Sequence, residues 1–430
     1  MRSDGGRGER FNEGPMVTFL PMPGLHITSE VNALEAVLVH TPGREIEAVT
    51  PRTREDYLYD DIIGVEIAAR EHARFVAVLE RFSKVHQIAD LLREVAEKQE
   101  ARDFLIQKTM DVVPSDDLAK RLAKLPSAEL VEMLIEGDEG GAGPIAKALN
   151  EIDYTLPPLP NLFFPRDIGM VIGGHSVVGS MRYGIRWTEE LLIKSLFTFH
   201  DALSNEGILY DGSEERRSNF TLEGGDVHVL REDLLVVGFS ERSSPAAIDA
   251  LCDEAFAKTK VKDVIVVVMP KVDTAIHLDM VFSQIDHELC MVYPPCFVGP
   301  ERFSVLHRKK GKEGVKEMPN FFAALRAVGL PVEPVFAGGE HRHTQDREQW
   351  ASACNFLAVR PGVILSYARN EATLGELAKA GFKIVESDDF LTRPKAKASG
   401  KMVITFPGGE LVRGGGGPRC MTMPLRRSAS

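Results

Sequence analysis

The sequence predicts an α/β fold built from repeated strand-strand-helix units and interrupted by an inserted helical subdomain. After residue 157, short apolar segments joined by tight turns alternate with amphipathic segments. The turns recur at intervals of roughly 55 to 75 residues, which is long enough for one hairpin and one helix in each unit. Before that point, residues 66–148 carry apolar side chains at steps of three and four, the spacing of amphipathic helices.

The beginning of the chain predicts an extension, a strand and a long helix. Residues 1–25 are rich in glycine and charge and lack periodicity, so we expect a disordered extension before a domain that spans 26–430. The apolar segment 36–40 predicts the first strand, because the turn residues Thr41-Pro42-Gly43 follow it. Apolar residues at helical steps between 68 and 98 predict one long amphipathic helix.

The helical subdomain, 66–148, is expected to continue in further short helices. Ser115 and Ser127 each precede a helical pattern and are positioned as N-caps, in which the hydroxyl accepts a hydrogen bond from a backbone amide of the first turn. The glycine-rich stretch 137–143 then ends this region. We therefore expect residues 66–148 to form a helical subdomain.

The second part of the chain predicts repeating units and a last hairpin, from which a glycine-rich stretch leads to Cys420. Each unit has a turn between two apolar strands, followed by a helical pattern. The turns are expected at 173–174, 231–232, 286–287 and 361–362, the helices at 188–203, 245–258, 320–328 and 373–380, and the strands of the last hairpin at 402–405 and 411–413.

Composition excludes several classes of protein. The chain has 430 residues, 44% of them hydrophobic, and no apolar run long enough to cross a membrane or to act as a secretion signal, so we expect a cytoplasmic protein without a membrane partner. A net charge of -12 disfavours nucleic acid as a partner. The five cysteines form no CxxC pair, and reduced thiols are expected. Whether the chain forms a homo-oligomer stays open.

Polar residues occur just before the first strand of several predicted units. They are Arg166-Asp167, the segment Glu223-Gly224-Gly225-Asp226, and His277-Leu278-Asp279, and Cys420 follows the last hairpin in the same sense. Loops at equivalent ends of radially arranged units converge, so these side chains are expected to meet. Carboxylates can orient a guanidinium cation by paired hydrogen bonds, a thiolate can attack its central carbon, and a histidine can move protons.

Read together, these segments are similar to those of the arginine deiminase family, within the superfamily of guanidinium-modifying enzymes. The resemblance covers almost the whole chain and implies a five-bladed α/β propeller with its active site on the pseudo-fivefold axis. The matching segments are Leu34 to Gly43, Asn161-Leu-Phe-Phe-Pro-Arg-Asp167, Leu222-Glu-Gly-Gly-Asp226, His277-Leu-Asp279, Arg347-Glu-Gln-Trp350, Tyr367-Ala-Arg-Asn370 and Arg419-Cys-Met-Thr-Met-Pro424.

The resemblance implies a hydrolase that converts L-arginine to L-citrulline and ammonium through a covalent amidino-cysteine, with no cofactor and no metal. It makes Cys420 the nucleophile and His277 the general acid and base. It assigns Glu223 and Asp279 to orient histidine and substrate. The guanidinium would lie between Asp167 and Asp279, and the substrate-binding residues would include Asn161, Arg186, Arg242, Arg419 and Asp226.

Three departures from the family pattern affect the expected fit of substrate. Gly415 stands where many members carry an arginine, five residues before the nucleophile, and Arg419 is a candidate to supply the missing charge. Pro165 stands where threonine is common. The basic insertion 307–316 has no assigned use.

Other interpretations stay open alongside the deiminase. His341, His343 and Asp346 lie close together, but their spacing is not that of a HExxH zinc site, and a polar loop is the better interpretation. Deimination of agmatine, transfer of the amidino group to an amine, and arginine binding without catalysis are the alternative functions. The remaining cysteines are expected to be inert core thiols, namely Cys252, Cys290, Cys296 and Cys354.

Overall fold

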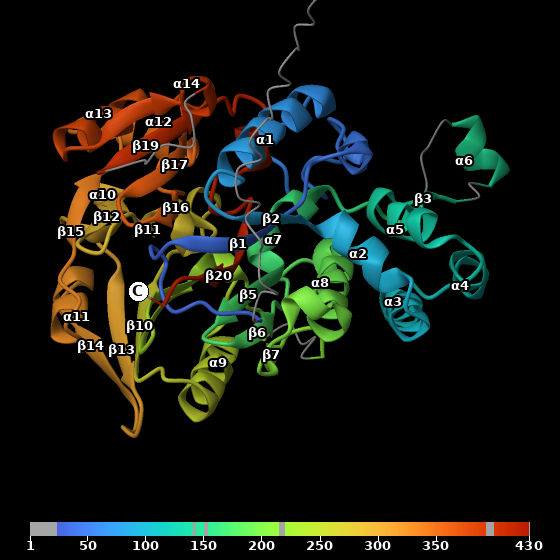
Figure 1. The fold of residues 1–430 in the computed structure, drawn as a ribbon, viewed down its shortest axis with the longest axis horizontal. Coiled ribbons are helices and arrows are strands. Elements are labelled where there is room, and N and C mark those ends of the chain that lie inside the picture. Colours follow the sequence, from blue (N-terminus) through green and yellow to red (C-terminus); the bar gives the residue numbers. More distant parts are fainter. Residues whose placement is uncertain (1–23, 141–142, 150–153, 215–219, 393–399, 430) are drawn as a thin grey trace, which may run out of the picture.

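The computed structural model describes residues 24–140, 143–149, 154–214, 220–392 and 400–429. It is a mixed α/β protein, with strands toward the middle and helices toward the outside (Figure 1). The first 23 residues of the predicted extension lie outside the described residues. Leu25 is buried and its amide donates to the carbonyl of Ser204, so the predicted boundary at residue 25 lies inside the folded part.

Five sheets contain the same three-strand arrangement. The first two strands are antiparallel, and the third is parallel to the second. Within the described ranges, no sheet closes on itself. The five sets are β20, β1 and β2 (Met423–Arg427, Leu34–Val39, Lys84–Gln87); β5, β6 and β7 (Gly169–Ile172, His175–Val178, Ile208–Asp211); β8, β9 and β10 (Val227–Arg231, Leu234–Phe239, Asp263–Val268); β11, β12 and β15 (Phe282–Gln284, Leu289–Val292, Glu333–Phe336); and β16, β17 and β19 (Leu357–Arg360, Val363–Tyr367, Met402–Phe406).

A helical connection joins the second strand of each set to the third. This confirms the predicted strand-strand-helix units, and all four predicted turns join the first and second strands of a set. A crossover of this kind is what a parallel pair of strands requires. The connecting helices are α1 (Val65–Leu79), α8 (Trp187–Phe199), α9 (Pro245–Lys258), α10 (Pro294–Phe297) with α11 (Phe321–Ala327), and α13 (Glu371–Lys379) with α14 (Ser387–Thr392), while α12 (Arg342–Trp350) leads from β15 to β16.

The long helix predicted between residues 68 and 98 is wrong, because a strand interrupts it. Residues 84–87 form β2, which pairs in parallel with β1, and separate helices precede and follow it. Four extended residues shift the apolar pattern too little for the helical spacing to reveal the break. The insertion that projects to the right in Figure 1 therefore starts after β2 and contains α2 (Ile88–Ala96), α3 (Gln99–Val112), α4 (Asp116–Leu122), α5 (Ser127–Glu136), α6 (Pro144–Ala148) and the pair β3 and β4 (Asp138–Glu139, Tyr154–Leu156).

The two predicted N-caps differ in outcome. Ser115 caps α4, and its hydroxyl accepts a hydrogen bond of 3.2 Å from the amide of Leu118. Ser127 is instead the first residue of α5, after Pro126, and its hydroxyl donates to the carbonyl of Ala96. That bond ties the start of α5 to the end of α2, so the serine serves a tertiary contact and not a cap.

Helices α2 to α5 of the insertion share a core with the main body. Their buried side chains, such as Leu92, Leu105 and Leu130, belong to one cluster with Leu192 and Leu196 of α8. Burying these side chains against the β5–β7 unit is the main source of stability for such short helices. The insertion is thus held as part of the main body.

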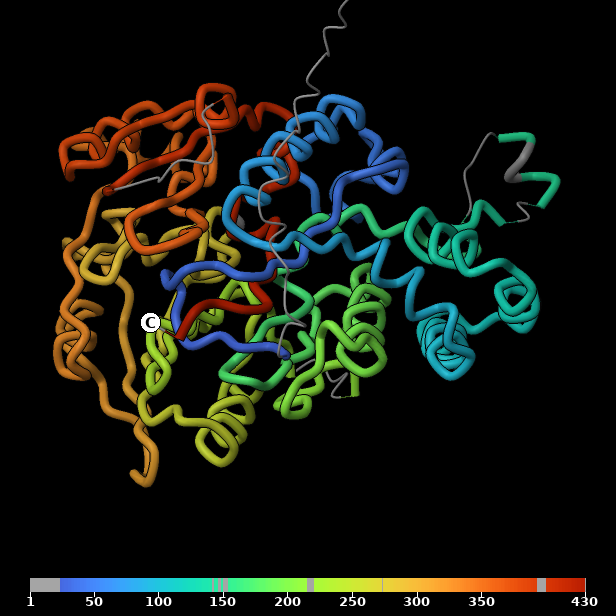
Figure 2. The backbone as a smooth tube through the Cα atoms, viewed as in Figure 1, coloured from blue at the N-terminus to red at the C-terminus, as the bar shows by residue number. Residues whose placement is uncertain are grey.

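The last predicted hairpin is wrong in its second strand. Residues 402–406 form β19, but it pairs in parallel with β17, and residues 411–414 form a 3₁₀ turn. The carboxylate of Glu71 in α1 accepts hydrogen bonds from the amides of Gly409, Glu410 and Leu411, and this contact replaces a strand partner. Strand β20 then pairs with β1, so the two ends of the fold run side by side (Figure 2).

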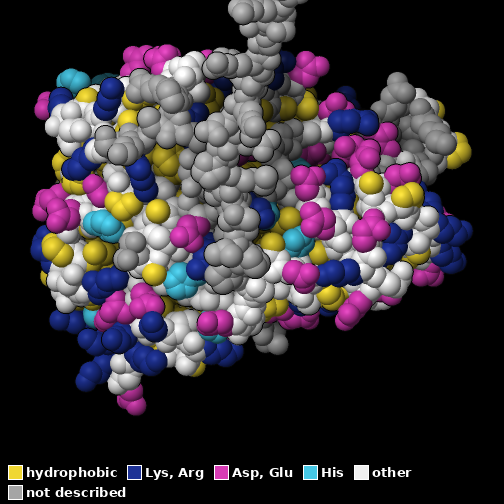
Figure 3. All heavy atoms as spheres, viewed as in Figure 1, with side chains coloured by type: hydrophobic (Ala, Val, Ile, Leu, Met, Phe, Trp, Pro, Cys, Tyr) yellow, Lys and Arg dark blue, Asp and Glu magenta, His cyan; other side chains and the backbone are white. Residues whose placement is uncertain are grey.

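The basic insertion 307–316 forms a surface hairpin. Strands β13 (Ser304–Lys309) and β14 (Val315–Met318) extend the sheet beyond β10, and Figure 3 shows Lys and Arg side chains gathered over this hairpin at the lower left. Strand β18 (Lys383–Glu386) similarly extends the sheet beyond β19. No described helix has the length and apolar character needed to cross a bilayer.

Candidate active site

Polar side chains lie two to four residues before the first strand of all five three-strand sets. Asp167 precedes β5, Glu223 precedes β8, Asp279 precedes β11, Asn355 precedes β16 and Cys420 precedes β20. All five side chains are buried. Equivalent positions in a repeated arrangement therefore bring residues from distant parts of the sequence into one region, as the sequence predicted for four of them.

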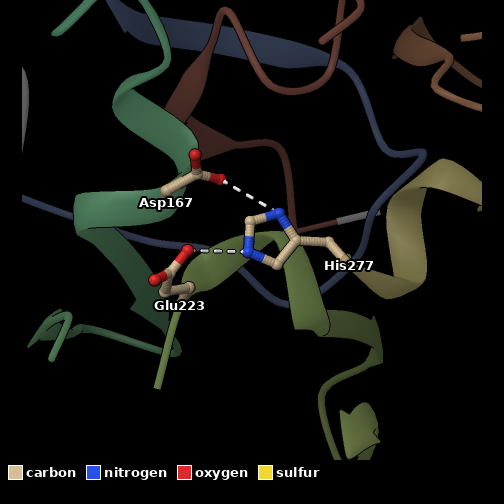
Figure 4. A group of neighbouring side chains, drawn as sticks. All are labelled: Asp167, Glu223 and His277. Carbon is tan, nitrogen blue, oxygen red and sulfur yellow. Dashed lines mark hydrogen bonds and ion pairs between the residues drawn. The ribbon is translucent and has the colours of Figure 1, made fainter. Parts of the chain in front are cut away.

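His277 lies between two carboxylates. Its Nε2 is 2.8 Å from Glu223 Oε2, and its Nδ1 is 3.7 Å from Asp167 Oδ1 (Figure 4). Burial alone would lower the pKa of His277, but the carboxylates of Asp167, Glu223 and Asp226 outweigh it and raise that pKa to about 9. The ring is therefore a protonated imidazolium at neutral pH and can donate a proton.

Glu223 remains ionised despite complete burial. Burial would raise its pKa, but Arg242 and His277 outweigh that effect and lower the pKa of Glu223 to about 2. Its other oxygen, Oε1, accepts a hydrogen bond of 2.9 Å from the amide of Arg182. Glu223 is thus a fixed negative charge that orients the ring of His277.

The two glycines after Glu223 permit this close packing. A Cβ atom on Gly225 would lie 2.6 Å from Nδ1 of His277, and one on Gly224 would lie 2.0 Å from the carbonyl oxygen of Arg166. Any side chain at either position would displace the histidine or the Asp167 segment. The segments that carry Glu223, Asp167 and His277 approach one another closely here, so glycine is required at both middle positions of the Glu-Gly-Gly-Asp sequence.

Cys420 contacts a carboxylate and an amide. Its Sγ lies 3.5 Å from Asp279 Oδ2 and 3.0 Å from the side-chain nitrogen of Asn355. Burial, together with the charges of Asp279 and Asp167, raises the pKa of the Cys420 thiol well above its usual range. In the unliganded site the thiol form is therefore favoured, and a cation between these carboxylates would favour the thiolate.

Six of the predicted residues line one small cavity of about 30 Å³. They are Asn161, Asp167, Arg186, Arg242, His277 and Cys420. Gly415 also lines it, in a left-handed conformation with φ of 84°. The cavity has room for about one water molecule, so a substrate of the size of arginine must displace some of the lining side chains.

Arg186 and Arg242 are held by acidic partners. Arg186 Nη1 is 2.7 Å from Asp167 Oδ2, and the other side of its guanidinium contacts Glu189 at 2.9 Å. Arg242 lies over the ring of Tyr183, with its Nη1 3.4 Å from Glu223 Oε2. Both guanidinium groups are buried, so they are not the surface ion pairs that the sequence alone would also allow.

The structure does not bring Arg419 or Asp226 to the cavity. The Arg419 guanidinium points to Glu30 and Asp279, with Nη1 2.9 Å from Asp279 Oδ2, and it is fully buried. Asp226 accepts hydrogen bonds from the amide of Leu278 at 2.9 Å and from the hydroxyl of Ser240 at 2.6 Å. Neither residue lines the cavity, so their predicted place among the substrate-binding residues has no support in the geometry.

Two carboxylate oxygens beside the thiol have unused hydrogen-bonding capacity. Oδ1 of Asp167 and Oδ1 of Asp279 are buried, and within the described ranges neither accepts a hydrogen bond. Buried carboxylate oxygens are costly to leave without donors. A planar cation with several N–H groups would satisfy both of them.

Asp167, Glu223 and His277 also have the spacing of a metal-binding group. One ligand atom from each lies within 4.8 Å of the others. A metal requires the neutral imidazole, however, and the carboxylates raise the pKa of His277 to about 9. A metal ion bound to this group would therefore have to displace the ring proton that the carboxylates stabilise.

The other histidine pair and the other cysteines lie outside this region. His341 and His343 are exposed at the start of α12, and Asp346 accepts hydrogen bonds from Tyr293 and Arg342. As predicted, four thiols are buried in the core, and burial raises the pKa of each of them: Cys252, Cys290, Cys296 and Cys354.

Asn355 is a buried polar residue beside the nucleophile that sequence reasoning missed. It lies within Ala353-Cys-Asn-Phe356, which reads as an apolar approach to a strand. The available signal was its position two residues before β16, equivalent to that of Asp167 before β5. A buried polar residue at the same point of every unit is the pattern that indicates Asn355.

Comparison with known sequences gives one family. The profile of the arginine deiminase family matches residues 55–427. The arginine deiminase of Listeria welshimeri is 33% identical over 422 residues, which cover 94% of this chain and 98% of the relative. That of Listeria innocua is 32% identical over 427 residues, with the same coverage.

Comparison with solved structures gives a shared fold at low identity. An amidinotransferase of saxitoxin biosynthesis from Microseira wollei has a TM-score of 0.55 at 13% identity, covering 94% of this chain and 98% of that one. The N-terminal domain of ArgZ, solved with a covalently bound reaction intermediate, has a TM-score of 0.51 at 14% identity and covers 91% and 98%. These two structures support the mixed α/β architecture.

Proposed function

The chain belongs to the arginine deiminase family, and we propose that it hydrolyses L-arginine to L-citrulline and ammonium through a covalent intermediate on Cys420. One observation carries this proposal. A thiol, an imidazolium and two carboxylate oxygens without donors lie around the same buried region. The carboxylate oxygens can bind a guanidinium cation, the thiol can attack its carbon as the thiolate, and the imidazolium can protonate the nitrogen that leaves.

The first half of the reaction forms the covalent intermediate. The guanidinium enters between Asp167 and Asp279, and its positive charge lowers the pKa of Cys420, so that the thiol releases its proton to solvent and the thiolate forms. Sγ attacks the guanidinium carbon and forms a C–S bond. His277 then donates its proton to one amino group, the C–N bond breaks, and ammonia leaves an amidinium thioether on Cys420.

The second half releases citrulline. His277, now neutral, removes a proton from water, and the resulting hydroxide adds to the amidinium carbon. The C–S bond breaks as the carbon–oxygen double bond forms, which regenerates the thiolate. The hydroxyl proton passes to ammonia, so the products are citrulline and ammonium, and His277 is again protonated.

The α-carboxylate of the substrate would be bound by Arg186, Arg242 and Asn161. A planar guanidinium group binds a carboxylate with two parallel hydrogen bonds. Arg186 is paired with Asp167 in the cavity of about 30 Å³, so we infer an exchange of partners. The substrate guanidinium takes the place of Arg186 beside Asp167, and Arg186 turns to the substrate carboxylate.

Gly415 leaves this site without the arginine that many relatives carry. Arg419 is bound to Glu30 and Asp279, and Arg413 pairs with Asp61 on the surface, so neither replaces that charge in the cavity. We infer that Arg419 instead positions Asp279 beside the sulfur. Asp226 has a similar indirect role, because it binds the backbone amide that follows His277.

We also propose that the five three-strand sets are the blades of a five-bladed α/β propeller, which is interrupted by a helical insertion that starts after β2 and not at residue 66. Two findings support this. Every set has the same topology. The polar residues that precede the first strands contact one another directly or through His277. A cytoplasmic location remains a prediction from the sequence.

The direct test is product analysis after incubation with L-arginine. The proposal requires stoichiometric citrulline and ammonium. If agmatine were the better substrate, the chain would be an agmatine deiminase. If the amidino group were transferred to an added amine such as glycine, it would be an amidinotransferase. Binding of arginine without either product, by a protein with a normal melting temperature, would make the chain a non-catalytic binding protein.

Substitution of Arg242 by alanine is expected mainly to raise KM for arginine. Its guanidinium would bind the carboxylate equally in the ground state and the transition state, so the effect on KM should exceed the smaller loss of kcat that follows from its contact with Glu223. The loss of one such contact corresponds to roughly a 10- to 100-fold increase in KM. Steady-state kinetics on agmatine, which lacks the carboxylate, provides the control. A fall confined to kcat, or an equal effect on both substrates, would contradict this role.

The pH dependence of turnover is expected to follow His277. With its pKa raised to about 9, this group is protonated below that pH, and kcat/KM should fall as pH rises through about 9. Glu223→Gln removes one of the carboxylates that raise this pKa, so the basic limb should move toward lower pH. A pH profile of the two proteins measures the shift. A limb that stays in place or moves upward would exclude His277 as the titrating acid.

A further inference from the structure

The side chain of Asn355 makes four hydrogen bonds at or beside the segment that carries the nucleophile. Its side-chain nitrogen lies 3.0 Å from Cys420 Sγ and 3.1 Å from the carbonyl oxygen of Asp279. Its side-chain oxygen accepts hydrogen bonds from the amide of Arg419 at 2.9 Å and from the amide of Cys420 at 3.1 Å. Only 1% of Asn355 is exposed, so water does not compete for these contacts.

These partners determine which way the amide group of Asn355 faces. Backbone N–H groups can only donate, so the atom that faces Arg419 and Cys420 must be the oxygen. The atom that faces the sulfur is therefore the NH₂ group, which donates one hydrogen to Sγ and one to the Asp279 carbonyl. The orientation follows from donor and acceptor chemistry alone.

We propose that Asn355 is a catalytic residue, which stabilises the Cys420 thiolate by donating a hydrogen bond to Sγ and holds the nucleophile in place through the amide of Cys420. The inference deepens the proposed function, on which its catalytic part rests. A donor on sulfur favours the anion over the thiol, because a thiolate is the stronger acceptor.

The electrostatics of the site give this donor its importance. Burial, Asp279 and Asp167 all raise the pKa of Cys420, and the Asp279 carboxylate lies 3.5 Å from Sγ. The substrate cation can offset the carboxylates only while it is bound. Asn355 is part of the protein and stays beside the sulfur, so it can stabilise the thiolate throughout the cycle, including after citrulline has left.

The test is the pKa of Cys420 in Asn355→Asp and Asn355→Ala. The first variant keeps an oxygen for the two backbone amides and loses the donor, and the second loses both. The rate of alkylation of Cys420 by iodoacetamide is followed from pH 6 to 10 by mass spectrometry of the peptide that contains it. We expect the pKa to rise by about one unit or more, with a roughly tenfold slower alkylation at neutral pH.

A matched control is available at a second buried asparagine. Asn370 is also fully buried, and its side-chain nitrogen donates to the carbonyl of Ala351 at 3.0 Å. Asn370→Asp makes the same chemical change away from the sulfur, so any loss of stability is comparable while the pKa of Cys420 stays at the wild-type value. Asn355→Asp also places a negative charge beside the sulfur, so Asn355→Ala decides between the two roles. A merely structural role for Asn355 predicts that the pKa of Cys420 in Asn355→Ala equals the wild-type value, and that result would overturn the proposal.

A second measurement uses the unaltered protein. In protein labelled with ¹⁵N at asparagine, the NH₂ signals of Asn355 should titrate with the same pKa as the alkylation of Cys420. Signals that do not respond to deprotonation or alkylation of the sulfur would also overturn the proposal. Neither measurement requires turnover, so the failure of arginine hydrolysis would refute the proposed function and leave the role of Asn355 at the sulfur intact.

Discussion

Replacement of Cys420 by serine is expected to abolish citrulline formation, with kcat reduced by at least about 10,000-fold and the fold retained. A serine hydroxyl in this position remains protonated, because its pKa is far above that of a thiol and both Asp279 and Asp167 oppose an anion there. Protonated oxygen cannot add to a resonance-stabilised guanidinium carbon. The substitution removes only the nucleophile, since the backbone contacts of the segment do not involve the sulfur.

Two measurements test this prediction. Rapid acid quenching of the wild-type protein with arginine should give a peptide containing Cys420 with increased mass, and the serine variant should give none. Cys252→Ser is the control, because this thiol is buried in α9 and does not line the cavity. Citrulline formation by Cys420→Ser at a rate near that of the control would refute covalent catalysis at this residue.

Much of the candidate site could be predicted because its residues occupy repeated positions. Asp167, Glu223 and His277 each precede a strand in a segment whose polar character is evident, and the structure brings them together. Position alone does not give the direction of a side chain. Arg419 and Cys420 are neighbours in sequence, but the thiol lines the cavity, while the guanidinium points away toward Glu30 and Asp279.

The missed elements of the fold share one physical cause, which is that tertiary contacts replaced a local preference. The helical spacing between residues 68 and 98 continues across β2, and pairing with β1 decides the extended conformation there. Residues 411–413 have strand-like composition, but Glu71 binds the amides of Gly409, Glu410 and Leu411, and a 3₁₀ turn results. Both partners lie far away in the sequence, so no local pattern could reveal them.

The charges around the thiol have two opposing effects on catalysis. The carboxylates that hold the cation also disfavour the thiolate that must attack it. Substrate binding resolves this conflict, because the guanidinium neutralises the carboxylates at the moment when the thiolate is needed. A substitution that removes one carboxylate should therefore separate the reactivity of the thiol from the turnover of the substrate.

Asp279→Asn is the substitution that makes this separation measurable. Loss of the negative charge 3.5 Å from Sγ lowers the pKa of Cys420, so alkylation by iodoacetamide at neutral pH should become faster. Turnover of arginine should nevertheless fall by about 1,000-fold, because one of the two carboxylates that hold the guanidinium is lost. Asp167→Asn should reduce turnover as well, with a smaller effect on alkylation, since no contact joins Asp167 to the sulfur. If alkylation and turnover both fell in Asp279→Asn, the carboxylate would be stabilising the nucleophile, and its assignment to the substrate cation would be wrong.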